Sequence, residues 1–207
     1  MFKIFGTDGI RCKVNKEPMT PDTCLKIAKA TGFLLSKKNT KKNRGVISKD
    51  TRLSGYLFEP LITSGFISMG MDVILVGPLP TPALPMLINS LRADMGVMIT
   101  ASHNTYEYNG LKFFDSQGNK ISKKLELEIE NIVLNHKKYL NIINKNSKTG
   151  KALRLEDAQV RYSEYLKLKL EKNINFNKNT KTGKALRLKD ARGRYSEFLK
   201  LTLGKKI

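Results

Sequence analysis

The sequence predicts a three-layer α/β/α fold built on a mixed, mostly parallel sheet, with a helical basic tail after it. Short apolar runs at 45–49, 72–76 and 95–100 alternate with longer amphipathic segments, which indicates strand–helix–strand units with crossover helices. The 207 residues are 40% hydrophobic and 27% charged, which is enough apolar surface to bury a core. The formal net charge of +20 is uneven, because residues 1–135 contribute +6 and residues 136–207 contribute +14.

The first two expected helices carry start signals of different kinds. The run Thr20–Asp22 offers a capping hydroxyl, a proline in the first turn and an acid at the positive end of the helix dipole. Ser54 is predicted to cap the next helix, which runs towards Met69. Pro60 falls inside that helix and is predicted to kink it, because proline removes a backbone hydrogen bond.

The remaining elements of the domain follow in the same alternation. Thr81 and Pro82 open a further helix between the second and third apolar runs. Asn109 and Gly110 are predicted to form a turn, followed by the strand-like run Leu111–Phe114. A last amphipathic helix is marked by apolar residues at helical spacing, namely Leu125, Ile129, Ile132 and Val133.

The basic tail contains an internal repeat. Residues 144–170 and 177–203 match at an offset of 33, and 21 of their 27 aligned positions are identical. Two such similar copies indicate a tandem duplication rather than a repeat array, which needs three or more copies to bury a core. Each copy is predicted to form one helix, at Leu155–Leu170 and at Leu188–Leu203.

Several classes of protein are excluded by composition. Cys12 and Cys24 lie twelve positions apart, which fits neither a zinc knuckle nor a redox pair and cannot form a disulfide scaffold. The N-terminus has no apolar signal core, and four prolines interrupt the most apolar stretch, 73–88. We therefore expect a cytoplasmic protein in a reducing compartment, without a membrane partner.

A basic tail can bind nucleic acid by neutralising phosphates. This tail has no RNA-binding fingerprint, zinc site or Gly-Arg tract, so nucleic acid is a disfavoured partner. The alternative is a lysine-rich solvated surface without a polyanionic ligand.

The most informative polar segment, Thr100–Asn104, directly follows an apolar run. α/β proteins bind ligands where strands end, and Ser102 is a possible nucleophile there. His103 and Asn104 adjoin it and Lys112 follows, which together suit a phosphate group. The alternative is an ordinary Ser-His pair, because adjacent residues on a strand point to opposite faces and His103 need not serve Ser102 as a base.

Two further clusters have both a functional and an ordinary interpretation. Gly6–Arg11 forms a tight turn with exposed amides, and Arg11 offers a bidentate fork for phosphate or carboxylate; the alternative is a simple Asp-Gly turn. Lys49–Ser54 lies where a strand joins a helix. We interpret it as surface ion pairing and a helix cap, at least for Ser54.

Five motifs in order resemble the N-terminal domain of the α-D-phosphohexomutases, and within that family they are most similar to the bacterial phosphoglucosamine mutases. The resemblance covers residues 1–143 and leaves 144–207 as a duplicated linker and helix segment. The motifs are FGTDGIR (5–11), VNKEPMTP (14–21), KDTRLSG (49–55), GPLPTPA (77–83) and TASHN with NGLKFF (100–104 and 109–114).

The resemblance implies a chemistry for these residues. Ser102 would carry a phosphoryl group, pass it to glucosamine 6-phosphate, and recover the other phosphate from the bisphosphate intermediate to leave glucosamine 1-phosphate. Mg²⁺ would bind Ser102 through its phosphate. Lys112 and Arg11 would face phosphate and His103 would support the loop; Thr7, Asn104 and Asn109 are assigned to substrate or phosphate binding.

The resemblance also implies binding partners, and alternative functions stay open beside it. Family members are well over twice this length, and an Asp-x-Asp-x-Asp metal run is absent here, so we expect the first domain only. A hexosamine phosphate is the expected substrate, and a separate chain carrying the missing domains is a possible partner. The alternatives are phosphomannomutase or phosphoglucomutase specificity, or a non-catalytic basic binding protein.

Overall fold

The computed structural model describes three segments of the chain, namely residues 3–36, 43–144 and 148–173. It contains two compact units, Met1–Glu164 and Tyr165–Ile207. The helix expected at 188–203 lies outside the described residues. The domain boundary at residue 143 stays a prediction, and the first compact unit includes a strand that follows it.

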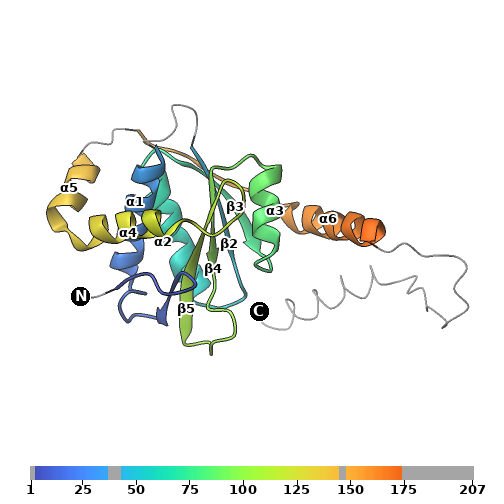
Figure 1. Cartoon of the computed structure of the whole chain (residues 1–207), viewed down its shortest axis with the longest axis horizontal. Helices are drawn as coiled ribbons and strands as arrows, with labels where there is room; N and C mark the ends of the chain where they lie inside the picture. The colour runs from blue at the N-terminus through green and yellow to red at the C-terminus, as the bar shows by residue number, and fades with distance from the viewer. Residues whose placement is uncertain (1–2, 37–42, 145–147, 174–207) are drawn as a thin grey trace, which may run out of the picture. The chain divides into compact units, whose positions relative to one another are not determined.

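Six strands of the first unit form one sheet (Figure 1). Strand β5 runs antiparallel to its neighbours β4 and β1, whereas β4, β2, β3 and β6 are parallel. Five of the six strands therefore point the same way, which confirms the mixed, mostly parallel sheet. In spatial order the strands are β1 (Ile10–Lys13), β5 (Tyr108–Asp115), β4 (Met95–Ile99), β2 (Arg44–Lys49), β3 (Asp72–Pro78) and β6 (Ala152–Arg154).

Helices cover both faces of this sheet. Helices α1, α2, α4 and α5 contact one another on one face, whereas α3 contacts β4 and β2 from the other (Figure 1). This confirms the three layers. None of the helices in the described segments is long and apolar enough to cross a membrane. The helices are α1 (Pro21–Ser36), α2 (Gly55–Ile67), α3 (Ala83–Ser90), α4 (Lys123–Leu134), α5 (His136–Asn144) and α6 (Ala158–Asn173).

The core lies between the sheet and the larger helical layer. Strand residues Ile47, Val97 and Leu111 are fully buried there against α1, α2 and α4. Burying each such side chain contributes about 1.5–3 kcal/mol. On the opposite face α3 packs so closely that a Cβ on Gly96 would lie 2.5 Å from Ile88 Cδ1. The sheet is thus fixed from both sides, and its edge is a rigid base for loops.

Several local predictions were wrong. The expected Asn109–Gly110 turn lies inside β5, because both residues pair with β1 and the Gly110 carbonyl accepts from Thr100 N on the other side. Ser54 makes no capping bond to α2, and its Oγ accepts a hydrogen bond from Asn109 Nδ2 at 2.7 Å instead. The tail helix begins at Ala158, because the residues before it form β6 and pair with β3. Pro60 lies inside α2 as expected, and the kink predicted there stays a prediction.

The strand registers place four residues in one row at the carboxyl edge of the sheet. Gly110 of β5 pairs with Arg11 of β1, and its carbonyl accepts from Thr100 N at 2.9 Å. Asp50 N donates to Ile99 O at 3.0 Å beside them. The chain leaves β2 for β3 on one side and returns to β4 on the other, so the row lies where the strand order reverses. Ligands bind at such points in α/β sheets.

Gly110 is expected to be required for the close approach of β1 to β5. A Cβ at this position would lie 2.3 Å from Ile10 O and 2.8 Å from Thr100 O. We therefore predict that Gly110→Ala lowers the free energy of unfolding by about 1–3 kcal/mol, the usual cost of overpacking. Urea unfolding measures it.

Gly45→Ala is the matched control, because an added Cβ in this buried strand would meet nothing closer than 3.6 Å. It should be neutral or stabilising by up to about 1 kcal/mol. Equal effects of the two substitutions would contradict the close approach.

Candidate active site

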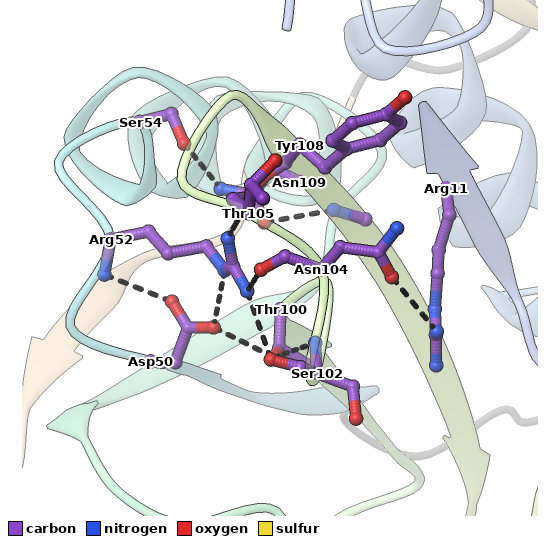
Figure 2. Close-up of polar contacts among 11 residues, drawn as sticks. Arg11, Asp50, Arg52, Ser54, Thr100, Ser102, Asn104, Thr105, Tyr108 and Asn109 are labelled. Carbon is purple, nitrogen blue, oxygen red and sulfur yellow. Dashed lines mark hydrogen bonds and ion pairs between the residues drawn. The ribbon is translucent and has the colours of Figure 1, made fainter. Parts of the chain in front are cut away.

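Ser102 lies on the loop that joins β4 to β5 at the carboxyl edge of the sheet. Its backbone φ is 56°, in the left-handed region that non-glycine residues rarely adopt. Its N–H donates to Thr100 Oγ1 at 2.9 Å. The side chain is exposed and points away from Asp50 and Arg52 (Figure 2). Within the described part of the chain the hydroxyl makes no hydrogen bond, so it is free to react.

Arg52 holds this loop from one side (Figure 2). It follows β2, and its side chain is only 12% exposed. The guanidinium donates to four backbone carbonyls of the β4–β5 loop, so a single side chain fixes most of the loop. These are Thr105 O at 2.6 Å and Tyr108 O at 3.2 Å from Nη1, and Ser102 O at 2.9 Å and Asn104 O at 2.7 Å from Nη2.

Asp50 orients Arg52 and links it to the end of β4. Its Oδ2 accepts from Arg52 Nε at 2.9 Å and from Thr100 Oγ1 at 2.7 Å. Its Oδ1 accepts from the Arg52 backbone N–H at 3.0 Å. The carboxylate therefore joins the ends of the neighbouring strands β2 and β4.

A second charged group lies on the β1 side of the loop. Asp8 Oδ2 accepts from Arg11 Nη2 at 2.8 Å and from Lys112 Nζ at 2.6 Å. Arg11 Nη1 also donates to Asn104 Oδ1 at 3.4 Å (Figure 2), which ties β1 to the Ser102 loop. The hydrogen bond from Lys112 is the main reason that the pKa of Asp8 lies below its ordinary value of 3.8. Partial burial opposes this shift, and the charges of Lys112, Arg11 and Lys120 add to it.

The turn that carries Asp8 is anchored through the residues around α4. Gly6 N donates to Gly9 O at 2.8 Å, as the predicted tight turn requires. Lys120 Nζ donates to Thr7 O at 2.6 Å and pairs with the buried Glu126 at 3.0 Å. Two pockets adjoin the turn. One of about 190 Å³ is lined by Asp8, Lys112 and Lys120 among others, and one of about 380 Å³ by Thr7, Asp8 and Arg11 among others.

Comparison with known proteins identifies the family. The family described as "Phosphoglucomutase/phosphomannomutase, alpha/beta/alpha domain I" matches residues 3–140. The chain belongs to this family. It is 49% identical over 173 residues to the phosphoglucosamine mutase of Thermodesulfovibrio yellowstonii, covering 84% of this chain and 38% of the relative. It is 50% identical over 171 residues to that of Granulibacter bethesdensis, covering 83% and 37%. The chain thus spans a little over a third of these relatives.

Solved structures agree with the assignment of the fold. A putative phosphomannomutase from Thermus thermophilus superposes with a TM-score of 0.66 at 31% identity, covering 80% of this chain and 35% of that one. A phosphoglucomutase/phosphomannomutase family protein from Burkholderia thailandensis gives a TM-score of 0.64 at 23% identity, covering 76% and 34%. The predicted resemblance to the phosphohexomutase family is therefore confirmed, together with the α/β fold.

The predicted site residues of this family domain fall into two groups. Ser102, Asn104, Arg11 and Lys112 gather at one edge of the sheet through the contacts given above. The other three are placed differently. Asn109 is fully buried and uses its amide on Ser54 and Gly110, Thr7 contributes its carbonyl to Lys120, and His103 is exposed beside Ser102. The chemical roles assigned to all seven stay predictions.

Sequence reasoning assigned no role to Asp50, Arg52 or Thr100. Surface ion pairing was left open as the ordinary interpretation of the run that contains the first two, and these two do pair with each other, but they also hold the loop that carries Ser102. One signal was available. Both polar runs, Lys49–Ser54 and Thr100–Asn104, directly follow buried apolar runs, and parallel neighbours would bring such ends together.

The described residues do not form a magnesium site by themselves. They contain no cluster of three or more His, Cys, Asp or Glu side chains that could hold a metal ion. The carboxylates at the Ser102 loop already have cationic partners, Asp8 with Arg11 and Lys112, Asp50 with Arg52, and Glu107 with Lys13. Mg²⁺ prefers carboxylate and phosphate oxygens, so a phosphorylated Ser102 would add oxygens of the kind that it prefers.

Lys112→Met is predicted to raise the pKa of Asp8 towards its ordinary value, because the hydrogen bond from Lys112 is the largest cause of the shift. A pH titration of the Asp8 carboxyl carbon by NMR measures it. In the wild type the lowered pKa stabilises the fold above the pKa of the unfolded chain, and this contribution is lost as the pH falls through the folded pKa.

Lys13→Met is the matched control, because Lys13 pairs with Glu107 and has no part in the Asp8 shift. An Asp8 pKa that moves as much in this variant as in Lys112→Met would contradict the assigned cause.

Proposed function

We propose that this chain is the phosphoserine domain of a phosphoglucosamine mutase, with Ser102 as the residue that carries the phosphoryl group. One observation carries the proposal. The exposed Ser102 hydroxyl makes no hydrogen bond with the residues that the structure describes, and it lies on a loop that Arg52 holds and Arg11 contacts through Asn104. The support from comparison is the identity of about half to phosphoglucosamine mutases over most of the chain.

The proposed reaction moves one phosphoryl group at a time. A bisphosphorylated glucosamine places one phosphorus at Ser102 Oγ, the serine O–P bond forms as the sugar O–P bond breaks, and the serine proton passes to the sugar oxygen. The reverse step on the other hydroxyl interconverts glucosamine 6-phosphate and glucosamine 1-phosphate. Such transfers depend on positioning and on neutralising charge, rather than on covalent chemistry by the protein.

Arg11 and Lys112 are the proposed phosphate-facing cations. Both now pair with the same oxygen of Asp8, whose side chain is 55% exposed. A phosphoryl group at Ser102 would compete with this carboxylate for them. Asn104 would keep Arg11 directed at the loop, whereas Asn109 would support the loop from the buried side. Thr7 and His103 would line its exposed side.

Magnesium, a hexosamine phosphate and further protein are proposed as the remaining components. Mg²⁺ would take the Ser102 phosphate as one ligand and the others from beyond the described residues. The relatives named above are more than twice as long as the region they share with this chain, so sugar recognition is proposed to require the regions outside the match, on this or a separate chain. The cytoplasmic location stays a prediction.

Phosphomannomutase or phosphoglucomutase specificity is the second candidate. Its support is the superposition on a putative phosphomannomutase, at 31% identity against 49% and 50% for the phosphoglucosamine mutases. We therefore propose the glucosamine phosphate, rather than a mannose or glucose phosphate, as the substrate. Binding of nucleic acid by the basic tail is not preferred, because its sequence has no RNA-binding fingerprint, zinc site or Gly-Arg tract.

The proposal predicts that the chain gains one phosphoryl group, about 80 Da, on incubation with glucosamine 1,6-bisphosphate and Mg²⁺. Intact-mass spectrometry measures the gain, and the released glucosamine monophosphate should be stoichiometric with it. Ser102→Ala should abolish the gain, because it removes the accepting oxygen.

The matched control is Ser116→Ala, which removes another exposed serine, on the turn after β5, and should leave the gain unchanged. Phosphorylation that persists in Ser102→Ala would assign the group to another residue. A wild-type chain that gains nothing would refute phosphoryl capture by this domain alone.

A further inference from the structure

Every N–H of the Arg52 guanidinium is used, and none of the partners is a group that reacts. The five donors make five hydrogen bonds, one to Asp50 and four to backbone carbonyls of the Ser102 loop. The planar guanidinium offers its five N–H groups in a fixed fork, whereas a lysine ammonium offers three on a flexible stem. This arrangement suits arginine specifically, and it fixes the carbonyls of Ser102, Asn104, Thr105 and Tyr108 relative to one another.

The same ion pair holds both sides of Ser102. Arg52 binds the carbonyl oxygen of Ser102 at 2.9 Å. Asp50 accepts from Thr100 Oγ1, which in turn accepts from the Ser102 N–H at 2.9 Å. The backbone of the nucleophile is therefore tied at its carbonyl to the cation and at its amide, through Thr100, to the anion.

Ser102 needs such support because its backbone is strained. A non-glycine residue in the left-handed region costs on the order of 1–3 kcal/mol and persists only where its surroundings impose it. Ser102 has a φ of 56° and an exposed side chain, so side-chain packing does not impose the conformation. Two hydrogen bonds do, one from Arg52 to the Ser102 carbonyl and one from the Ser102 N–H to Thr100 Oγ1.

We propose that Arg52 is a positioning residue that sets the rate at which Ser102 accepts a phosphoryl group. The inference rests on the proposed function of Ser102. Asp50 neutralises the charge of Arg52, and Figure 2 shows the Ser102 side chain directed away from both. Arg52 therefore acts through the backbone, and the binding of phosphate is left to Arg11 and Lys112.

The test compares Arg52→Lys with the wild type in single-turnover phosphorylation by glucosamine 1,6-bisphosphate, followed by intact mass at several bisphosphate concentrations. Lysine keeps the charge but loses the fork. We expect the limiting rate constant to fall by roughly ten- to a hundredfold, because small misplacements of reacting groups have effects of this size. The concentration at half the limiting rate should change by less than about threefold, since the phosphate-facing cations remain.

Chemical rescue separates positioning from a general loss of structure. Adding millimolar guanidinium to Arg52→Ala should restore part of the rate, whereas ammonium at the same ionic strength should not. Arg44→Lys is the matched control, because Arg44 begins β2, the strand that Arg52 follows, and also donates to a backbone carbonyl, Leu91 O at 2.9 Å, but at the opposite end of the sheet. It should leave the rate unchanged.

Amide hydrogen exchange of residues 102–108 gives a readout that does not depend on phosphorylation. Arg52→Lys should speed exchange in this loop and leave the core strands protected. An unchanged limiting rate in Arg52→Lys, with a wild type that is phosphorylated, overturns the proposal. If the wild type gains no phosphoryl group, the proposed function fails and the rate-setting role fails with it. In that case amide hydrogen exchange alone tests whether Arg52 holds the loop. Exchange that is unchanged in Arg52→Lys would show that it does not.

Discussion

The parallel pairing of β2 with β4 is the constraint on which the site depends. It brings the two strand ends together, so that Asp50 and Arg52 from one meet Thr100 and Ser102 from the other. Neither run could order Ser102 alone. Its carbonyl is held by Arg52, 50 positions away in the chain, and Thr100, which holds its amide, is itself bonded to Asp50 at the same separation. The crossover topology, with helices on both faces, is what makes these neighbours adjacent. The fold thus specifies the position of Ser102, the proposed nucleophile, before any ligand contact contributes.

The strands and helices that were predicted from the sequence are those whose own residues carry the signal. The apolar runs and helix signals identified β2 to β4 and the main helices, because burial imposes periodicity on each segment. Strands β1 and β6 were missed, since these short edge strands have little apolar character and depend on partners far along the chain. The Asn109–Gly110 turn was wrong for the same reason. Pairing on both sides overrode the local preference, and Gly110 serves the close approach of β1 instead of a turn.

The site shows the same division between local and distant information. The loop with Ser102 was predicted because a polar run after a buried strand has a local signature. The role of Arg52 had no local signature in the sequence, because its partners are backbone carbonyls, which every residue has. Asn109 was expected in a turn, whereas it lies in β5 and its amide is buried against Ser54. In each case the residue types were informative and the missing information was which strands are neighbours.

Three sets of ion pairs at this edge of the sheet differ in how exposed their side chains are. Lys49 and Glu59 form a buried pair at 2.7 Å beneath the site, and removing one partner of such a pair costs about 3–5 kcal/mol. Asp50 and Arg52 lie above it, 25% and 12% exposed. In the pairs of Asp8 with Arg11 and Lys112 the carboxylate is 55% exposed, whereas the two cations are 25% and 16% exposed. Under the proposed function, a phosphoryl group on Ser102 would compete with this exposed carboxylate for the two cations, while the more buried carboxylates of Asp50 and Glu59 keep their partners. The exposure of the carboxylate therefore distinguishes the pairs that phosphate would enter from those that would hold its proposed acceptor in place.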